Sequence, residues 1–271
     1  MRSDAPLLNS RILKGIKKGL KVFVIGNEFN ANYKYSHLGN DKSILNDILE
    51  GKYPELFGEK SALLLGRKAL VQKDGYYIHR LALDIAQKMG INAFNLLHTS
   101  ASTVAGLDFG FSCDGGIDEI YNKINKGDIK LSFLLGADDI NLDIIKKTFV
   151  IYQGTHADKA IRYANIILPA ETYTEKFATY TNNEGKIQIT TKAVESPLEA
   201  KNDAEIIHII AKKMRIFIPE FEYSIKQSLI ELPIENFNGQ NFANITGDNY
   251  CKCSISRNSK TMLECEKQLN S

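Results

Sequence analysis

Residues 149–188, FVIYQGTHADKAIRYANIILPAETYTEKFATYTNNEGKIQ, decide how the chain folds. The opening run of aromatic and β-branched residues, 149–152, predicts a strand that ends at Gly154. A polar turn and a short helix over 159–164 follow, and the apolar run 166–168 predicts a second strand. A strand, a short crossover and another strand are typical of the edge of a parallel α/β sheet.

The second half of this stretch has a different pattern. Residues 178–189 place Thr, Tyr and polar side chains on both sides of the sequence Asn182-Asn183-Glu184-Gly185. Asn and Gly tolerate positive φ at little cost. We therefore predict a β-hairpin whose turn lies at these four residues.

The pattern of an apolar run ending in glycine recurs along the chain, alternating with helical patterns. The glycines are Gly26, Gly66 and Gly136, and the helical patterns cover 41–50, 74–89, 117–124 and 203–214. This alternation predicts an α/β fold with a doubly wound, mostly parallel sheet over residues 1–215. Residues 216–271, which become rich in Asn, Ser, Gly and Lys, are expected to form a largely irregular, poorly ordered extension.

Length and composition limit the classes of function. The 271 residues are 44% hydrophobic, which is enough for a good-sized core. A net charge of +2 means that acidic and basic residues nearly cancel, so we expect no nucleic-acid partner. No apolar stretch reaches the roughly 20 residues that cross a bilayer, so we expect no direct membrane span.

The cysteines do not predict a metal site. Cys251, Cys253 and Cys265 lie close together near the end of the chain. A four-iron cluster needs four cysteinyl ligands at tighter spacings. We therefore expect no metal on this chain and reduced thiols that have no ligand role.

The carboxyl ends of parallel strands form the crevice where ligands usually bind. Neither the G-x-G-x-x-G nor the Walker spacing follows any predicted strand. Asp138 and Asp139 could bind a cation or a ribose hydroxyl, although helix capping is the simpler interpretation. His156 and Asp158 are the best acid–base candidates, but no nucleophile accompanies them and a polar turn explains both. We predict no catalytic residue.

Several sequence words, in this order, resemble one family. They are LLGAD at 134–138, ANIILP at 164–169, YTEK at 173–176 and ATYTNNEGKIQ at 178–188. Together with flanking words they resemble, over about residues 4–215, the C-terminal part of the G subunit of NADH:quinone oxidoreductase, respiratory complex I. That subunit belongs to the molybdopterin oxidoreductase superfamily.

The resemblance implies a vestigial crevice. In molybdopterin enzymes the matching segments lie near the pterin guanine dinucleotide, whereas the pocket of the complex I subunit is generally considered degenerate. The residues that match are Gly154, Thr155, His156, Asp158, Asn182 and Glu184. The resemblance therefore implies no cofactor on this chain, with iron–sulfur clusters only in an N-terminal part that this sequence lacks.

The resemblance also implies a function. We expect a structural scaffold that supports electron transfer from NADH to quinone without carrying a cluster. Its partners would be the other peripheral-arm subunits and the cluster-bearing N-terminal half of the G subunit. Its location would be the cytoplasmic face of a bacterial inner membrane, or the matrix side in mitochondria.

Two alternatives belong to other classes. One is a fragment of a working molybdopterin-dependent oxidoreductase, such as a formate dehydrogenase large subunit. The words at 173–176 and 178–182 favour complex I over it. The other is a free-standing small-molecule binding module, for which only the generic crevice argues.

Overall fold

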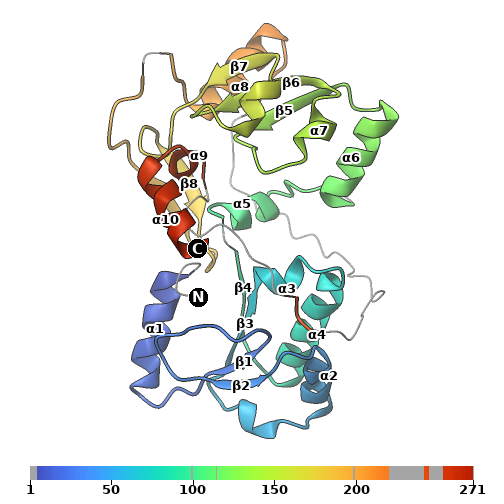
Figure 1. Cartoon of the computed structure of the whole chain (residues 1–271), viewed down its shortest axis with the longest axis vertical. Helices are drawn as coiled ribbons and strands as arrows, with labels where there is room; N and C mark the ends of the chain where they lie inside the picture. The colour runs from blue at the N-terminus through green and yellow to red at the C-terminus, as the bar shows by residue number, and fades with distance from the viewer. Residues whose placement is uncertain are drawn as a thin grey trace. The chain divides into compact units, whose positions relative to one another are not determined.

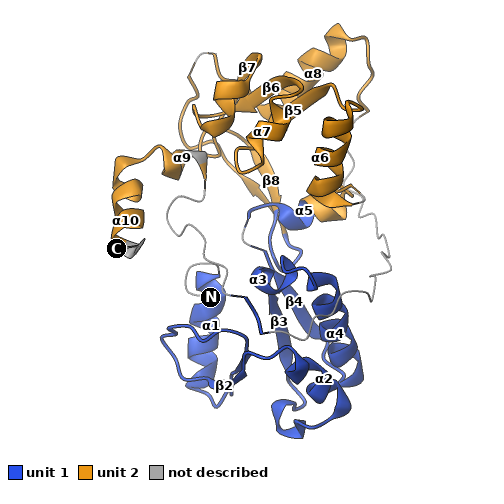
Figure 2. Ribbon diagram, turned by 45° about the vertical axis from the view of Figure 1, so that its right-hand side comes forward, with its two compact units in different colours: residues 1–105, 181–186, 227–246 blue, residues 106–180, 187–226, 247–271 orange. Residues whose placement is uncertain are grey.

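The computed structural model describes residues 5–98, 100–113, 115–197, 199–219, 241–243 and 253–270. The chain divides into two compact units (Figure 2). The first comprises residues 1–105, 181–186 and 227–246, and the second comprises 106–180, 187–226 and 247–271. Each unit has its own cluster of buried apolar side chains.

The first unit contains two pairs of parallel strands and the helices that follow them (Figure 1). Its strands are β1 (Phe23–Ile25), β2 (Ser36–Gly39), β3 (Ala62–Gly66) and β4 (Ala93–Leu97). Its helices are α1 (Pro6–Ile16), α2 (Ser43–Glu50), η1 (Pro54–Leu56), α3 (Arg67–Leu70) and α4 (Gly75–Lys88), and α5 (Thr103–Asp108) leads into the second unit.

The core of the first unit lies between α2 and α4. Ile44 and Ile48 are four residues apart and therefore project from one face of α2, where they pack with Ile85 of α4. Gly51 ends α2 with φ of +88°, a left-handed conformation that glycine adopts without strain. The sequence pattern predicted both helices.

The second unit is built around one parallel sheet. Its strands β5 (Leu131–Leu135), β6 (Phe149–Gly154) and β7 (Ile166–Pro169) lie side by side in that order (Figure 1). The connections contain α7 (Leu142–Ile145) and η2 (Lys159–Tyr163), while α6 (Gly116–Lys126) precedes β5 and α8 (Asp203–Lys213) comes later. The predicted strand, crossover and strand are confirmed.

The central strand β6 organises the core of this unit. Val150 and Tyr152 are fully buried and pack with Leu134, Ile124 and Ile145. The side chains that alternate with them face the other side of the sheet, where Phe149 is 46% exposed and Ile151 is partly buried. The apolar run therefore serves one fully buried face and one partly covered face.

The predicted hairpin is also confirmed. β8 (Ala178–Thr181) pairs with β9 (Ile187–Thr190), and Gly185 in the turn has φ of +76°. The side-chain oxygen of Asn182 accepts hydrogen bonds from the backbone N–H groups of Glu184 and Lys186, both at 2.9 Å. Such a bond fixes the turn in a geometry that favours Asn at its first position.

The structure confirms the α/β class with mostly parallel strands, but the described strands form separate sheets of two, two, three and two strands. β2 was not predicted, because Ser36-His37-Leu38-Gly39 has a single large apolar residue. Its parallel pairing with β1, and not its own composition, makes it a strand. In the extension that was expected to be irregular, residues Ser254–Arg257 and Lys260–Asn270 form helices α9 and α10. Most of the remaining extension lies outside the described residues.

Candidate functional site

The candidate site lies at the carboxyl edge of the sheet β5–β6–β7. β6 ends there at Gly154, whose carbonyl accepts a hydrogen bond from the N–H of Ala170 at 3.0 Å. A Cβ on residue 154 would lie 2.6 Å from the ring of Tyr152. Glycine at this position therefore lets the buried Tyr152 ring reach the crevice.

Asp138 is the buried centre of the polar network at this edge. Only 3% of its surface is exposed, and its two oxygens accept hydrogen bonds from the Tyr152 hydroxyl and the Ala160 N–H, each at 3.0 Å. Burial, together with the bond to Asp138, raises the pKa of Tyr152 above its ordinary value, so the hydroxyl stays a donor. Asp138 thus holds the first turn of η2 through Ala160, which is a structural role.

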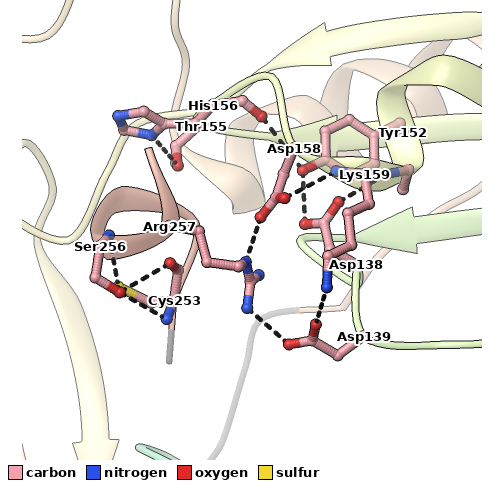
Figure 3. Close-up of polar contacts among 11 residues, drawn as sticks. Asp138, Asp139, Tyr152, Thr155, His156, Asp158, Lys159, Cys253, Ser256 and Arg257 are labelled. Carbon is pink, nitrogen blue, oxygen red and sulfur yellow. Dashed lines mark hydrogen bonds and ion pairs between the residues drawn. The ribbon is translucent and has the colours of Figure 1, made fainter. Parts of the chain in front are cut away.

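Asp158 and Asp139 hold an arginine from the far end of the chain (Figure 3). Arg257 of α9 donates from Nε to Asp158 at 2.7 Å and from Nη1 to Asp139 at 2.8 Å. The other oxygen of Asp158 accepts from the Lys159 N–H at 2.8 Å, at the start of η2. The Lys159 ammonium lies 3.4 Å from Asp139.

The predicted pair of His156 and Asp158 does not form an acid–base dyad. Nδ1 of His156 lies 2.9 Å from the hydroxyl of Thr155, in an exposed position. The Asp158 carboxylate is engaged by Arg257 and by the start of η2. The two residues share a turn, as the simpler interpretation of the sequence proposed.

The remaining crevice candidates, Asn182 and Glu184, belong to the first unit. Asn182 closes the hairpin turn, and Glu184 pairs with Arg11 at 2.7 Å in an exposed position. Asn183 between them accepts a bond from Asn95 at 2.6 Å and donates to the carbonyl of His98 at 3.3 Å. The structure therefore places Gly154, Thr155, His156 and Asp158 together at the end of β6. Asn182 instead closes the hairpin turn, and Glu184 forms an ion pair with Arg11.

The carboxyl edge of β1–β2 in the first unit is covered by residues 241–243. The N–H of Phe242 donates to the carbonyl of Asn40 at 3.0 Å, and Asn27 donates to the carbonyl of Ala243 at 3.2 Å. The Phe242 ring lies 5.7 Å from Nζ of Lys42, which forms a buried ion pair with Asp74 at 2.9 Å. We call residues 241–243 the strap.

Two cavities open beside the polar network of the second unit. The smaller, of about 250 Å³, is lined by Thr155, His156, Pro169, Ala170, Thr172, Glu175, Pro197, Glu199 and Ala200. The larger, of about 400 Å³, is lined by Ala157, Asp158, Lys159, Ile161, Arg162 and Asn258. Within the described residues, no three His, Cys, Asp or Glu side chains converge as a metal site would require.

A parallel α/β sheet with a polar crevice at its carboxyl edge defines a class of ligand-binding and redox proteins. Within that class, the chain belongs to the molybdopterin oxidoreductase family, whose sequence model matches residues 1–213.

Individual proteins that are similar to the chain are subunits of one enzyme complex. The chain is 35% identical over 300 residues to the NADH-ubiquinone oxidoreductase 75 kDa subunit of Reclinomonas americana, a match that covers 98% of this chain and 43% of the relative. It is 40% identical over 227 residues to the G subunit of NADH-quinone oxidoreductase of Rickettsia prowazekii, a match that covers 80% of this chain and 32% of the relative. A mitochondrial 78 kDa subunit of NADH-ubiquinone oxidoreductase from Candida albicans is 35% identical over 242 residues.

These relatives are much longer than the chain, which spans 43% of the first and 32% of the second. The match to complex I subunits confirms the resemblance found in the sequence words. Among the helices that the structure describes, none is long and apolar enough to cross a membrane.

The family implies a pterin dinucleotide, and the residues at the second unit's crevice do not fit one. A pyrophosphate needs cations or backbone N–H groups. The smaller cavity instead has Glu175 and Glu199 on its walls and no Lys or Arg among its lining residues. The buried Thr172 hydroxyl there has no partner among the described residues, but a single hydroxyl does not neutralise a phosphate. The larger cavity has two cationic lining residues, Lys159, which is paired with Asp139, and Arg162. One arginine beside the Asp158 carboxylate does not balance a doubly charged pyrophosphate.

Arg257 is the residue that sequence reasoning missed. It lies in an Asn- and Ser-rich tail, with no apolar periodicity beside it to predict a helix. Its partners are 99 and 118 residues away in the chain. No local signal could have joined them.

Proposed function

We propose that this chain is a structural part of the peripheral arm of NADH:quinone oxidoreductase, corresponding to the C-terminal, molybdopterin-oxidoreductase-like part of the G subunit. It supports electron transfer from NADH to quinone without carrying a cluster or cofactor. The supporting observation is the 35% identity that extends over 98% of the chain to a complex I subunit.

The chemistry of the crevice is in keeping with a scaffold. Asp138 is committed to Tyr152 and η2, and Asp158 is committed to Arg257. Groups that are already fully hydrogen-bonded inside the protein are poor candidates for binding and releasing a substrate. His156 is half-buried and its ring contacts a hydroxyl, with no carboxylate among the described residues orienting it.

The proposal includes partners and a location. The chain packs against the other peripheral-arm subunits and against the cluster-bearing N-terminal part of the G subunit. It lies on the cytoplasmic face of a bacterial inner membrane, or on the matrix side in mitochondria.

Co-purification tests the assembly. A tagged copy of the chain, expressed in the source cells, should recover other complex I subunits, identified by mass spectrometry after mild detergent extraction. The matched control carries the same tag on an unrelated protein of similar size. Recovery of no complex I subunit by the tagged chain would overturn the proposed assembly.

Elemental analysis and a visible spectrum test the absence of a cofactor. We expect no stoichiometric iron, molybdenum or flavin in the purified chain. Stoichiometric molybdenum retained through gel filtration would instead favour a fragment of a working molybdopterin-dependent oxidoreductase, the class for which the family match to residues 1–213 argues.

A further inference from the structure

The C-terminal residues 253–258 form a compact turn that carries Arg257, and we call them the latch. The N–H of Arg257 donates to the carbonyl of Cys253 at 2.9 Å, and the Ser256 hydroxyl donates to the same carbonyl at 3.0 Å. The Cys253 N–H in turn donates to the Ser256 oxygen at 3.1 Å. These bonds fix the backbone from which the guanidinium projects.

The guanidinium of Arg257 bridges two carboxylates on different loops. Nε binds Asp158, which follows β6, and Nη1 binds Asp139, which follows β5 (Figure 3). The side chains of Arg257 and Asp158 are only 13% and 7% exposed. Charges removed from water to this extent need close partners, because the loss of either member leaves the other buried and unpaired.

The two acceptors differ in how firmly they are held. The side chain of Asp158 is buried and is fixed by the N–H of Lys159. Asp139 is 63% exposed, but it follows directly after Asp138, which is fixed by Tyr152 and Ala160. A planar guanidinium can donate to two carboxylates at once through different N–H groups, whereas an ammonium is a point charge. The crevice is therefore shaped for a guanidinium.

We propose that the carboxyl-edge crevice of β5–β6–β7 is a guanidinium-binding site filled by the chain itself: Arg257 is an internal ligand that fastens the latch, and with it α10, onto the sheet. Asn258 of the latch forms part of the wall of the larger cavity, beside Asp158. Release of the latch would open that wall and expose the buried carboxylate of Asp158. This inference is independent of any role in electron transfer.

Amide hydrogen exchange of the full chain, followed by mass spectrometry, tests the proposal. Arg257→Ala should raise the exchange rate of residues 254–270 at least about tenfold. This is a lower bound, because removing one member of a buried ion pair is strongly destabilising. Arg257→Lys keeps the charge but loses the planar fork, so its exchange rate should lie between those of wild type and Arg257→Ala.

Lys260→Ala provides the matched control, because it removes the same charge from the exposed first position of α10. Its exchange rates should equal those of the wild type. Asp158→Asn should resemble Arg257→Ala, and the double variant should be no worse than either single one, since the two side chains act as a pair.

Either of two results would overturn the proposal that Arg257 fastens the latch. In the first, Arg257→Ala leaves residues 254–270 as protected as in the wild type. In the second, β6 loses protection as much as 254–270 does, which would make Arg257 an ordinary contributor to global stability. Free arginine at high concentration offers a further check, because it should raise exchange in 254–270 while equal concentrations of lysine should not.

Discussion

Lys42 and Asp74 form an ion pair that is almost completely removed from solvent, with Nζ 2.9 Å from both carboxylate oxygens and the two side chains 2% and 0% exposed. Replacing either partner alone leaves a buried charge. We expect Lys42→Met or Asp74→Leu to destabilise the first unit by about 3–5 kcal/mol.

The double variant Lys42→Met/Asp74→Leu removes both charges and keeps comparable volumes, so it should recover most of that loss. Urea unfolding followed by circular dichroism measures all three variants. Additive losses in the double variant would show that the two side chains do not act as a pair.

Gly185 in the hairpin turn should be sensitive to β-branched substitution. Its φ of +76° is strained for a β-branched residue, whereas nothing lies within 4 Å of the position that a Cβ would occupy, so the backbone and not crowding sets the cost. We expect Gly185→Val to cost about 1–3 kcal/mol and to weaken co-purification with complex I subunits.

Gly185→Asn tests the same position with a residue that tolerates positive φ, and it should be milder. Melting temperatures of the two variants measure the difference. Equal losses would show that the positive φ is not what this turn requires.

The stability of the first unit should fall in mild acid because of His79. Burial lowers the pKa of His79 in the folded protein, so the unfolded chain binds the proton more readily. The stability that neutral His79 contributes is fully present above the unfolded pKa of about 6.5. It is lost as the pH falls through the lower pKa of His79 in the folded protein.

His79→Gln removes this titration and should reduce the change in unfolding free energy between about pH 7.5 and about pH 5. Burial also lowers the pKa of His98 in the same unit, so part of the change should remain. The stacked ring of Phe94, with centroids 6.1 Å apart, remains available to pack on the glutamine. Urea titrations at the two pH values measure the slope, and a slope equal to that of the wild type contradicts the assignment to His79.

Cys253 should be more reactive than the other described thiols. Burial opposes ionisation, but hydrogen bonding of the sulfur with the Ser256 side chain and with backbone N–H groups outweighs it and lowers the pKa of the Cys253 thiol. At about pH 7 we expect iodoacetamide to modify Cys253 about threefold faster or more than Cys113, which is also exposed.

Ser256→Ala removes the hydroxyl and should bring the two rates closer together. Peptide mass spectrometry separates the cysteines. Equal rates at Cys113 and Cys253 in the wild-type chain would contradict the assigned hydrogen bonds.

Periodicity in the sequence predicted the parts of the fold that depend on local patterns. The run 149–152 is apolar because one face of β6 is fully buried and the other is partly covered. Asn182 and Gly185 carry the preferences of one turn. β2 escaped prediction because its pairing with β1, and not its own composition, makes it a strand.

The polar network of the site could not be predicted, because its partners are distant in the chain. Asp138 and Asp158 were recognised as polar loop residues, but Arg257, which decides what Asp158 can bind, is 99 residues further on. A carboxylate that follows a strand looks the same in sequence whether it faces a ligand or an arginine of its own chain.

The strap has a consequence for how the protein is made. Phe242 binds Asn40 across 202 positions of sequence, so the edge of β1–β2 stays open while all the residues between them are translated. At about 5–20 residues per second, that interval is on the order of ten seconds or more. Contacts of such long range also slow folding. The edge of β1–β2 is therefore translated early but completed late. Throughout that interval Lys42 lacks its contact with the ring of Phe242.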